Sequence, residues 1–468
     1  MKELLKKFGA FSIGPMAAAV ISLITVPLIT HFISPAEYGR TSMFTLAQGM
    51  LSMLMYMGMD QAFVREFNAT KEQMSKLMTN AVAIPAVIVL VLDIIIVVNA
   101  ELVSYMLFDN NDEYLAVWLL ALMLPFMIIS HFSLLKIRME EKGVQYSFFT
   151  ILLKVVILIL TVILFALYEK NFRSVVYAMA VAEIINGSIL YVLALRPLKL
   201  NIKNLEKNLI NKMLAFGLPL IPASILSWVL TSMDKVMLRT MCDYGELGLY
   251  TAAFKIVSVL SIVQTCFTLF WTPVAYRWYE EKVDNKQFEL VNKLVAAVMT
   301  AMCMGILIFK DVVAFILGED FAAAIYIFPF ILLNPIMYTM SEATAVGIGF
   351  SRKTHYTIIV SASSGILNIV LNYLLIPLCG SVGAAIATGI SYIVFFWVRT
   401  LISRKLWYAF PIKDYVVYTI LILINGWVNT FVIGLPAYLT SIVSLILVGI
   451  YNYKSIIQII SLIKRKDR

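Results

Sequence analysis

Long apolar runs alternate with short polar segments along almost the whole chain. Each run holds about 20 or more mostly apolar residues, which is the length that an α-helix needs to cross a bilayer. Helices are expected because a chain inside lipid must satisfy its own backbone hydrogen bonds. The pattern therefore predicts an all-α, polytopic membrane protein with about fourteen transmembrane helices. The predicted helices lie at residues 8–33, 40–64, 74–98, 114–136, 144–168, 173–196, 212–239, 248–274, 288–309, 322–345, 355–377, 381–403, 414–433 and 435–455.

The composition supports this fold class. Hydrophobic residues make up 61% of the chain and charged residues 14%, whereas a soluble domain has about 25% charged residues. The net charge of +9 does not indicate a nucleic-acid partner, because the basic residues lie in short loops between apolar runs. The four cysteines are isolated in or beside apolar runs, so we expect neither a disulfide nor a metal site.

The distribution of Lys and Arg predicts the orientation in the membrane. When the N-terminus is placed in the cytoplasm, most of the 37 Lys and Arg residues fall in cytoplasmic loops and ends. The predicted outer segment NAELVSYMLFDNNDEY has none, whereas the predicted cytoplasmic segment RPLKLNIKNLEKNLINK has five. An even number of helices returns the basic tail to the same side, so we expect both termini in the cytoplasm.

The two halves of the chain share short sequence matches at a nearly constant spacing of about 208 residues. The matches are Phe8-Gly9 with Phe216-Gly217, Pro15 with Pro222, Glu37-Tyr38-Gly39 with Glu246-Leu247-Gly248, and Ser174-Val175 with Ser381-Val382. They predict two six-helix lobes of parallel topology, related by a pseudo-two-fold axis along the membrane normal.

The predicted domains follow from this repeat. An N-lobe takes residues 1–200, a cytoplasmic linker residues 201–211 and a C-lobe residues 212–408. Residues 409–468 add helices 13 and 14 and a basic cytoplasmic tail. Paired lobes of this kind are typical of transporters that alternate access around a central site.

Several segments together resemble a known family. They are ISPAEYG, GMDQAFVREF, DKVMLRTMCDYGELGLYTAAFKI and GSVGAAIATGISY. The ensemble resembles the polysaccharide transport family, the oligosaccharide flippases of the multidrug/oligosaccharidyl-lipid/polysaccharide (MOP) flippase superfamily. The resemblance covers essentially the whole chain.

The resemblance implies a flippase of the bacterial cytoplasmic (inner) membrane. Its substrate would be an undecaprenyl-diphosphate-linked oligosaccharide, moved from the cytoplasmic to the periplasmic leaflet by alternating access. The product would serve O-antigen, capsule or exopolysaccharide biosynthesis. The partners implied are this lipid-linked glycan, the lipid bilayer, and polysaccharide polymerase and assembly proteins.

Charged residues inside predicted helices are the candidate binding residues, because a charge at the bilayer centre costs about 2.5–3.5 kcal/mol. Lys154 and Lys255 lie within predicted helices, and we expect them to bind the negatively charged diphosphate in a cavity. Arg65 would act near the cytoplasmic entrance. Glu183 lies at a similar depth to Lys154, and a buried structural pair between the two is the open alternative.

A second group of residues are candidates for a gate or for ion coupling. They are Asp60, Glu183, Asp234, Lys235 and Arg239. The last three lie at the outer end of the helix at residues 212–239, where they would close an outer gate, receive the diphosphate on release or anchor the helix at the interface. A buried carboxylate would exchange H+ or Na+ during the cycle. No GxxxxGK[ST] motif is present, so we expect no direct use of ATP and no cofactor.

Three alternatives remain at this point. A cation-coupled multidrug exporter would need acidic residues in its cavity, and the helix at residues 8–33 has none. A flippase for a peptidoglycan lipid precursor has the same sequence features as one for other lipid-linked glycans. An enzyme would require a larger extramembrane domain or an acidic metal-binding motif such as DxD, and neither is visible, so we expect no enzyme.

Overall fold

The computed structural model describes residues 2–68, 73–353 and 355–466, which form helices and turns with no strand among them. The all-α fold class is therefore confirmed. The chain forms two compact units, Met1–Met233 and Asp234–Arg468. The predicted boundaries at residues 200, 211 and 408 stay a prediction, and the last two residues of the predicted tail lie outside the described part.

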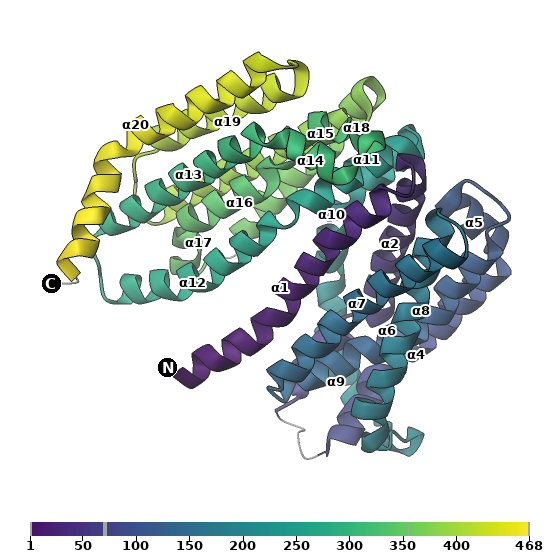
Figure 1. The fold of residues 1–468 in the computed structure, drawn as a ribbon. Helices are drawn as coiled ribbons and strands as arrows, with labels where there is room; N and C mark the ends of the chain where they lie inside the picture. Colours follow the sequence, from purple (N-terminus) through teal and green to yellow (C-terminus); the bar gives the residue numbers. More distant parts are fainter. Residues whose placement is uncertain (1, 69–72, 354, 467–468) are drawn as a thin grey trace. The chain divides into compact units, whose positions relative to one another are not determined.

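The described residues of unit 1 form ten helices and several short turns, coloured purple to teal in Figure 1. The α-helices are α1 (Lys2–Thr30), α2 (Pro35–Tyr56), α3 (Met59–Glu66), α4 (Met74–Val98), α5 (Ala100–Phe108), α6 (Tyr114–Met139), α7 (Gly143–Leu167), α8 (Phe172–Leu190), α9 (Lys207–Gly217) and the first part of α10 (Ile221–Met241). A π-helical turn, Tyr191–Leu195, extends α8, and the 3-10 turn Leu218–Leu220 joins α9 to α10.

Unit 2 begins inside α10 and contains the remaining helices, coloured teal to yellow in Figure 1. They are α11 (Tyr244–Val257), α12 (Leu260–Glu280), α13 (Asn285–Ile308), α14 (Lys310–Leu317), α15 (Ala324–Ile331), α16 (Leu333–Thr344), α17 (Val346–Phe350), α18 (Tyr356–Leu406), α19 (Lys413–Phe431) and α20 (Leu435–Lys466).

Nine helical segments of the described residues are long and apolar enough to cross a membrane, and the bent pair α11–α12 would add a tenth. Helix α18 is one of these nine segments, but it has 51 residues. At 1.5 Å per residue its length is about 76 Å, which is more than twice the thickness of the hydrocarbon core, about 30 Å. It breaks at Gly380, whose φ of 55° is left-handed, so it holds the two helices predicted at 355–377 and 381–403. Helices α2, α10 and α19 are also long but carry more polar residues. The number fourteen therefore stays a prediction.

Four of the predicted spans are broken helices in the structure. They are the spans at 40–64 (α2 and α3), 212–239 (α9 and α10), 248–274 (α11 and α12, bent by 40°) and 322–345 (α15 and α16). The first break lies at Met57 and Gly58, which both have positive φ. Gly58 packs on Gly217, because a Cβ on Gly58 would lie only 2.5 Å from the Gly217 carbonyl oxygen. Two broken helices therefore cross where neither has a side chain.

Unit 1 is a bundle of long helices. Helix α1 packs along α7, α6 packs along α8, and α4 packs along α6 (Figure 1). Small residues allow this close packing: the Gly14 N–H of α1 donates to Ser147 Oγ of α7 at 2.9 Å. On α8, a Cβ on Gly187 would lie 2.8 Å from the Phe126 carbonyl oxygen of α6. Helix pairs that approach through small residues are typical of membrane bundles.

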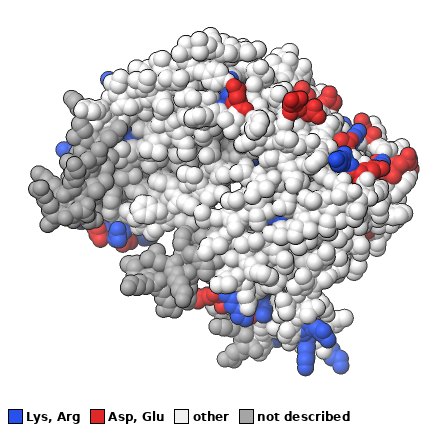
Figure 2. All heavy atoms as spheres, viewed as in Figure 1, with Lys and Arg blue, Asp and Glu red and all other residues white. Residues whose placement is uncertain are grey.

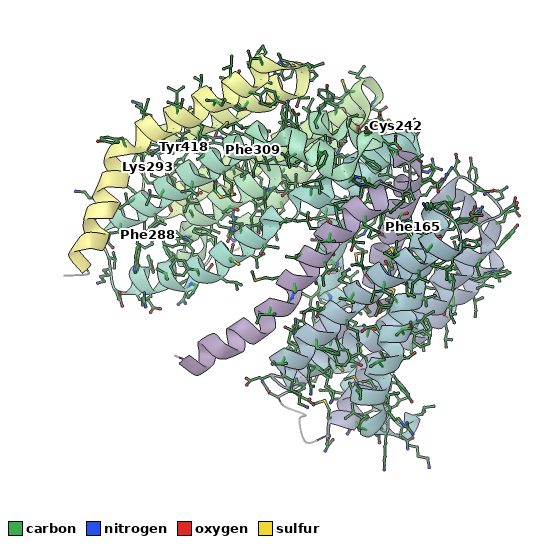
Figure 3. The ribbon with its side chains drawn as sticks, viewed as in Figure 1. Phe165, Cys242, Phe288, Lys293, Phe309 and Tyr418 are labelled. Carbon is green, nitrogen blue, oxygen red and sulfur yellow. The ribbon has the colours of Figure 1, made fainter. Side chains whose placement is uncertain are left out.

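In unit 2, α15 and α16 pack on α18, α13 packs on α16, and α19 packs on both α15 and α13. One end of the unit is an aromatic core around Phe288, labelled in Figure 3, with Trp271 and Phe350 buried against it. Helices α19 and α20 lie side by side (Figure 1). Polar side chains join them, including the Asn425–Ser444 hydrogen bond of 2.7 Å. Such bonds replace the hydrophobic force that lipid does not supply between helices.

The charges on the visible face gather towards the ends of the helices. Figure 2 shows an almost uncharged surface between these ends, where only isolated coloured atoms appear. Many large apolar side chains within the long helices are exposed, for example Val87 of α4 and Ile159 of α7. An extensive apolar surface of this kind fits a lipid environment.

Candidate functional site

Asp234 is the centre of a buried polar network in unit 2. It is 5% exposed, and its carboxylate accepts hydrogen bonds from Tyr250 Oη at 2.6 Å, Asn372 Nδ2 at 2.7 Å and Thr388 Oγ1 at 2.7 Å. Asn368 lies in the same group, since its Oδ1 accepts from Asn372 Nδ2 at 3.0 Å. We call these five residues the Asp234 network. All three donors to the carboxylate are uncharged.

The local helix geometry explains why these side chains meet. Asn368 and Asn372 are four residues apart in α18 and so lie on one face of the helix. The break at Gly380 turns the chain back, which brings Thr388 of the same element to the same carboxylate. Tyr250 comes from α11 and is fully buried. A membrane helix places amides and a carboxylate inside only where they find partners.

The Asp234 network gathers several side-chain oxygen atoms in one buried place. Its oxygen atoms come from one carboxylate, two side-chain amides and two hydroxyls, and the buried Asn372 Oδ1 accepts no hydrogen bond. Oxygen ligands of this kind suit hard cations. Within the described residues, no group of three His, Cys, Asp or Glu residues forms a metal site of the usual kind. Any metal ion here would therefore be held mostly by neutral oxygens.

The neighbours of Asp234 on α10 lie against aromatic rings. The Lys235 ammonium lies 5.1 Å from the centre of the Phe254 ring and interacts electrostatically with Asp234. The Arg239 guanidinium lies 4.5 Å from the centre of the Tyr244 ring. The three residues predicted as one group are thus neighbours, and Asp234 is the one placed at the centre of the network. The gate role of Lys235 and Arg239 stays a prediction.

Unit 1 has a second polar group, around His131 of α6. The His131 ring stacks on Tyr56 with centroids 4.1 Å apart, and its Nε2 lies 3.6 Å from Asp60 Oδ2. This separation is long for a hydrogen bond but allows an ion pair when the imidazole is protonated. Gln61 Nε2 donates to the same Asp60 oxygen at 2.9 Å. The break at Gly58 turns the chain so that the start of α3 brings Asp60 to this position.

Glu183 of α8 and Lys154 of α7 interact electrostatically inside unit 1. Glu183 is 8% exposed and also lies near Tyr56, which connects it to the His131 group. The structure therefore brings together three residues singled out from the sequence: Lys154, Glu183 and Asp60. The arrangement supports both of the readings left open, a structural pair and a substrate-binding group.

The other predicted diphosphate ligands lie at the surface of their units. Arg65 of α3 is exposed, and its guanidinium lies 4.4 Å from the centre of the Phe216 ring. Lys255 of α11 is also exposed. Arg65 and Lys154 belong to unit 1, whereas Lys255 belongs to unit 2. Near Arg65, Lys212 Nζ donates to the buried Glu66 at 2.6 Å and joins α9 to α3.

Unit 1 contains a cavity of about 590 Å³. It lies between the end of α2, the start of α3 and the first part of α10, and we call it the α2–α10 cavity. Its lining includes Tyr56, Asp60, Gln61, Ser224 and Trp228. The cavity therefore opens beside the two helix breaks at Gly58 and at residues 218–220. Interrupted helices commonly line substrate pathways in transporters.

Sequence reasoning missed most of the uncharged members of these groups. It assigned no functional role to His131, Tyr250, Asn368, Asn372 or Thr388. One signal was present, because Asn368 and Asn372 are two amides at helical spacing within an apolar run. Amides in such a run require partners, just as charges do.

Comparison with known proteins identifies the family. Residues 4–278, more than half of the chain, match the family described as polysaccharide biosynthesis protein. The chain belongs to this family. The resemblance recognised from the sequence is thereby confirmed.

One curated relative of this polysaccharide biosynthesis family member is the probable low-salt glycan biosynthesis flippase Agl15 of Haloferax volcanii. The two are 23% identical over 177 residues, which span 37% of this chain and 37% of the relative. The match therefore covers well under two thirds of the length of Agl15.

Two solved structures share the fold of this polysaccharide biosynthesis family member. The lipid II flippase MurJ in an inward closed conformation superposes with a TM-score of 0.72 and 17% identity, over 95% of this chain and 99% of MurJ. An inward-facing multidrug resistance MATE family transporter of the MOP superfamily gives 0.61 and 15%, over 84% of this chain and 94% of the transporter. The chain therefore has the fold of MOP superfamily transporters, and it is a polytopic membrane protein.

Proposed function

We propose that this protein is a flippase that moves a lipid-linked glycan across a membrane, and that it is a transporter and not an enzyme. The finer proposal is an undecaprenyl-diphosphate-linked oligosaccharide carried from the cytoplasmic to the periplasmic leaflet by alternating access. The product would enter biosynthesis of O-antigen, capsule or exopolysaccharide.

The observation that carries this proposal is the α2–α10 cavity, with its aromatic, hydroxyl, amide and carboxylate groups, inside a unit whose long helices are apolar enough to cross a membrane. A lipid-linked glycan has a tail that lipid already solvates and a polar head that lipid excludes. Such a substrate needs a polar path only for its head. The family match and the fold of MOP transporters support the same reading.

The proposed location is the bacterial cytoplasmic membrane with both termini in the cytoplasm. The excess of Lys and Arg in the predicted cytoplasmic segments supports this orientation. The proposed partners are the lipid-linked glycan and the bilayer, followed by polymerase and assembly proteins that would use the exported units.

We assign the charged residues two roles within this proposal. Lys154, Lys255 and Arg65 would attract the diphosphate electrostatically during its passage. The Asp234 network would couple transport to H+ or Na+, because its central carboxylate is buried and its hydrogen-bond partners are all uncharged groups. Glu183 and Asp60 would be alternative proton carriers in unit 1.

Deletion of the gene in its native host tests the function. Surface glycan is stained, and extracted lipids are searched for undecaprenyl-diphosphate-linked oligosaccharide. We expect loss of surface glycan and accumulation of the lipid-linked unit, both reversed by the wild-type gene. The accumulated lipid also identifies the substrate, and a peptidoglycan precursor in its place would replace the finer proposal. Normal surface glycan together with new sensitivity to cationic dyes would instead indicate a multidrug exporter.

A further inference from the structure

The α2–α10 cavity has a lining chemistry that differs from that of the charged residues assigned to the diphosphate. Two aromatic side chains, Tyr56 and Trp228, lie in its wall together with the hydroxyls of Ser224 and Ser227. Asp60 and Gln61 add a carboxylate and an amide. Among the described lining residues there is no Lys or Arg. A diphosphate would therefore meet a carboxylate here and no cation.

Each of the two aromatic side chains of the cavity also contacts another helix of unit 1. The Tyr56 ring stacks on His131, with an interplanar angle of 12°. The Trp228 indole lies against α2 at Gly49, where an added Cβ would be 3.7 Å from Nε1. Rings that are fixed by packing lose little conformational freedom when a ligand stacks on them.

The polar groups of the cavity complement hydroxyl groups. A carboxylate accepts only, an amide both donates and accepts, and a serine hydroxyl does either. Asp60 is fixed by Gln61 and by the nearby His131. Ser224 and Ser227 are exposed in α10, one helical turn apart. A sugar ring presents hydroxyls at its edge and C–H groups on its face, so it fits polar groups and aromatic faces at the same time.

We propose that the α2–α10 cavity binds a neutral sugar ring of the lipid-linked glycan, with Trp228 and Tyr56 against its C–H face and Asp60, Gln61 and the two serines on its hydroxyls. The volume of about 590 Å³ falls within the range of about 300–1,000 Å³ found for small-molecule sites. The diphosphate would lie outside this cavity.

This inference rests on the proposed function, and binding measurements can separate the two. The full-length protein is placed in nanodiscs, and dissociation constants are measured for undecaprenyl diphosphate and for undecaprenyl diphosphate carrying one N-acetylglucosamine. The ratio of the two constants isolates the contribution of the sugar. We expect the sugar-bearing lipid to bind the wild-type protein more tightly.

The variant Trp228→Ala removes the aromatic face. We expect it to reduce the affinity ratio by about threefold to tenfold, while the affinity for undecaprenyl diphosphate itself stays unchanged. The conservative Trp228→Phe should retain most of the preference for the sugar-bearing lipid. The double variant Ser224→Ala/Ser227→Ala should lower this preference although both aromatic rings remain. The matched control is Trp118→Ala, which removes an exposed tryptophan of α6 outside the cavity lining.

Each outcome has a distinct meaning. If neither lipid binds the wild-type protein, the proposed function fails. If both lipids bind equally, or if the ratio survives in Trp228→Ala and in the double serine variant, the sugar site is wrong and the flippase proposal stands. Unchanged binding of undecaprenyl diphosphate also shows that each variant is folded.

Discussion

Glu246 of α11 accepts a hydrogen bond from the backbone N–H of Ser381 at 2.7 Å, directly after the break of α18 at Gly380. In unit 1, Glu37 of α2 accepts the same kind of bond from the N–H of Phe172, the first residue of α8, at 2.8 Å. The spacing is identical, since 246 − 37 and 381 − 172 both equal 209. Each unit therefore uses a carboxylate in the first turn of one helix, α2 or α11, to accept a hydrogen bond from the start of another, α8 or the second part of α18.

Removal of these capping carboxylates should destabilise each unit. Glu246→Ala and Glu37→Ala each leave a buried or half-buried N–H without its acceptor, which costs about 1–3 kcal/mol. We expect a lower apparent melting temperature in detergent for both variants and a smaller drop for the Gln variants, which keep an acceptor oxygen. The exposed Asp112→Ala is the control. Alanine variants that melt at the wild-type temperature would show that the caps do not stabilise the helices.

The Asp234 network predicts different effects for two substitutions of one residue. Asp234→Ala deprives Tyr250, Asn372 and Thr388 of their acceptor, at about 1–3 kcal/mol for each unsatisfied group, so we expect low protein abundance. Asp234→Asn keeps the shape and removes the charge. We expect normal abundance but surface glycan reduced to the level of the deletion strain. Tyr250→Phe keeps the charge and should retain export. Full export by Asp234→Asn would exclude a coupling role.

A double-mutant cycle decides between the two readings of Lys154 and Glu183. Lys154→Met or Glu183→Gln alone leaves one buried charge without its partner, which costs about 3–5 kcal/mol. The double variant removes both charges, and we expect a coupling energy of about 0.5–3 kcal/mol and recovered abundance. If Lys154 binds diphosphate, export stays low in the double variant despite this recovery. Recovered export would make the pair purely structural.

Glu140, between α6 and α7, gives a prediction on pH. Although burial raises its pKa, hydrogen bonds from Lys142 and Lys136 outweigh this effect and hold the pKa below the ordinary range. A carboxyl group whose pKa is lower in the folded than in the unfolded state stabilises the folded protein at pH values above the unfolded-state pKa of about 4.3. This stabilisation is lost as the pH falls through the folded-state pKa. Glu140→Gln should therefore lower stability at pH 7 by less than about 1 kcal/mol. Melting curves of the two proteins should converge in acid, and a constant difference down to acidic pH would contradict the assignment.

The sequence predicted the helical fold because lipid imposes one simple rule on apolar runs. It also predicted the repeat, since Glu37 and Glu246 perform the same contact in both units. The alignment of the two repeats was off by two residues at this point. The sequence paired Ser174 with Ser381, whereas the structure pairs Phe172 with Ser381, because Glu37 contacts Phe172 and Glu246 contacts Ser381. A backbone N–H makes this contact, and backbone groups have no sequence signature.

The candidate site was harder to predict because its partners are distant in the chain and mostly uncharged. Lys154 and Glu183 were found through the cost of burying charge. His131 was not, since its contact with Asp60 depends on the helix break at Gly58. Hydropathy places Lys255 inside a span but does not say which way it faces, and the structure leaves it exposed on α11.

Flipping by the purified protein tests the central claim most directly. The protein is reconstituted into liposomes with an undecaprenyl-diphosphate-linked glycan that carries a fluorophore on its sugar, and an impermeant reductant quenches the outer leaflet. The account predicts that wild-type protein makes nearly all of the fluorescence accessible and that Asp234→Asn slows this process. Quenching no greater than in protein-free liposomes would contradict the account.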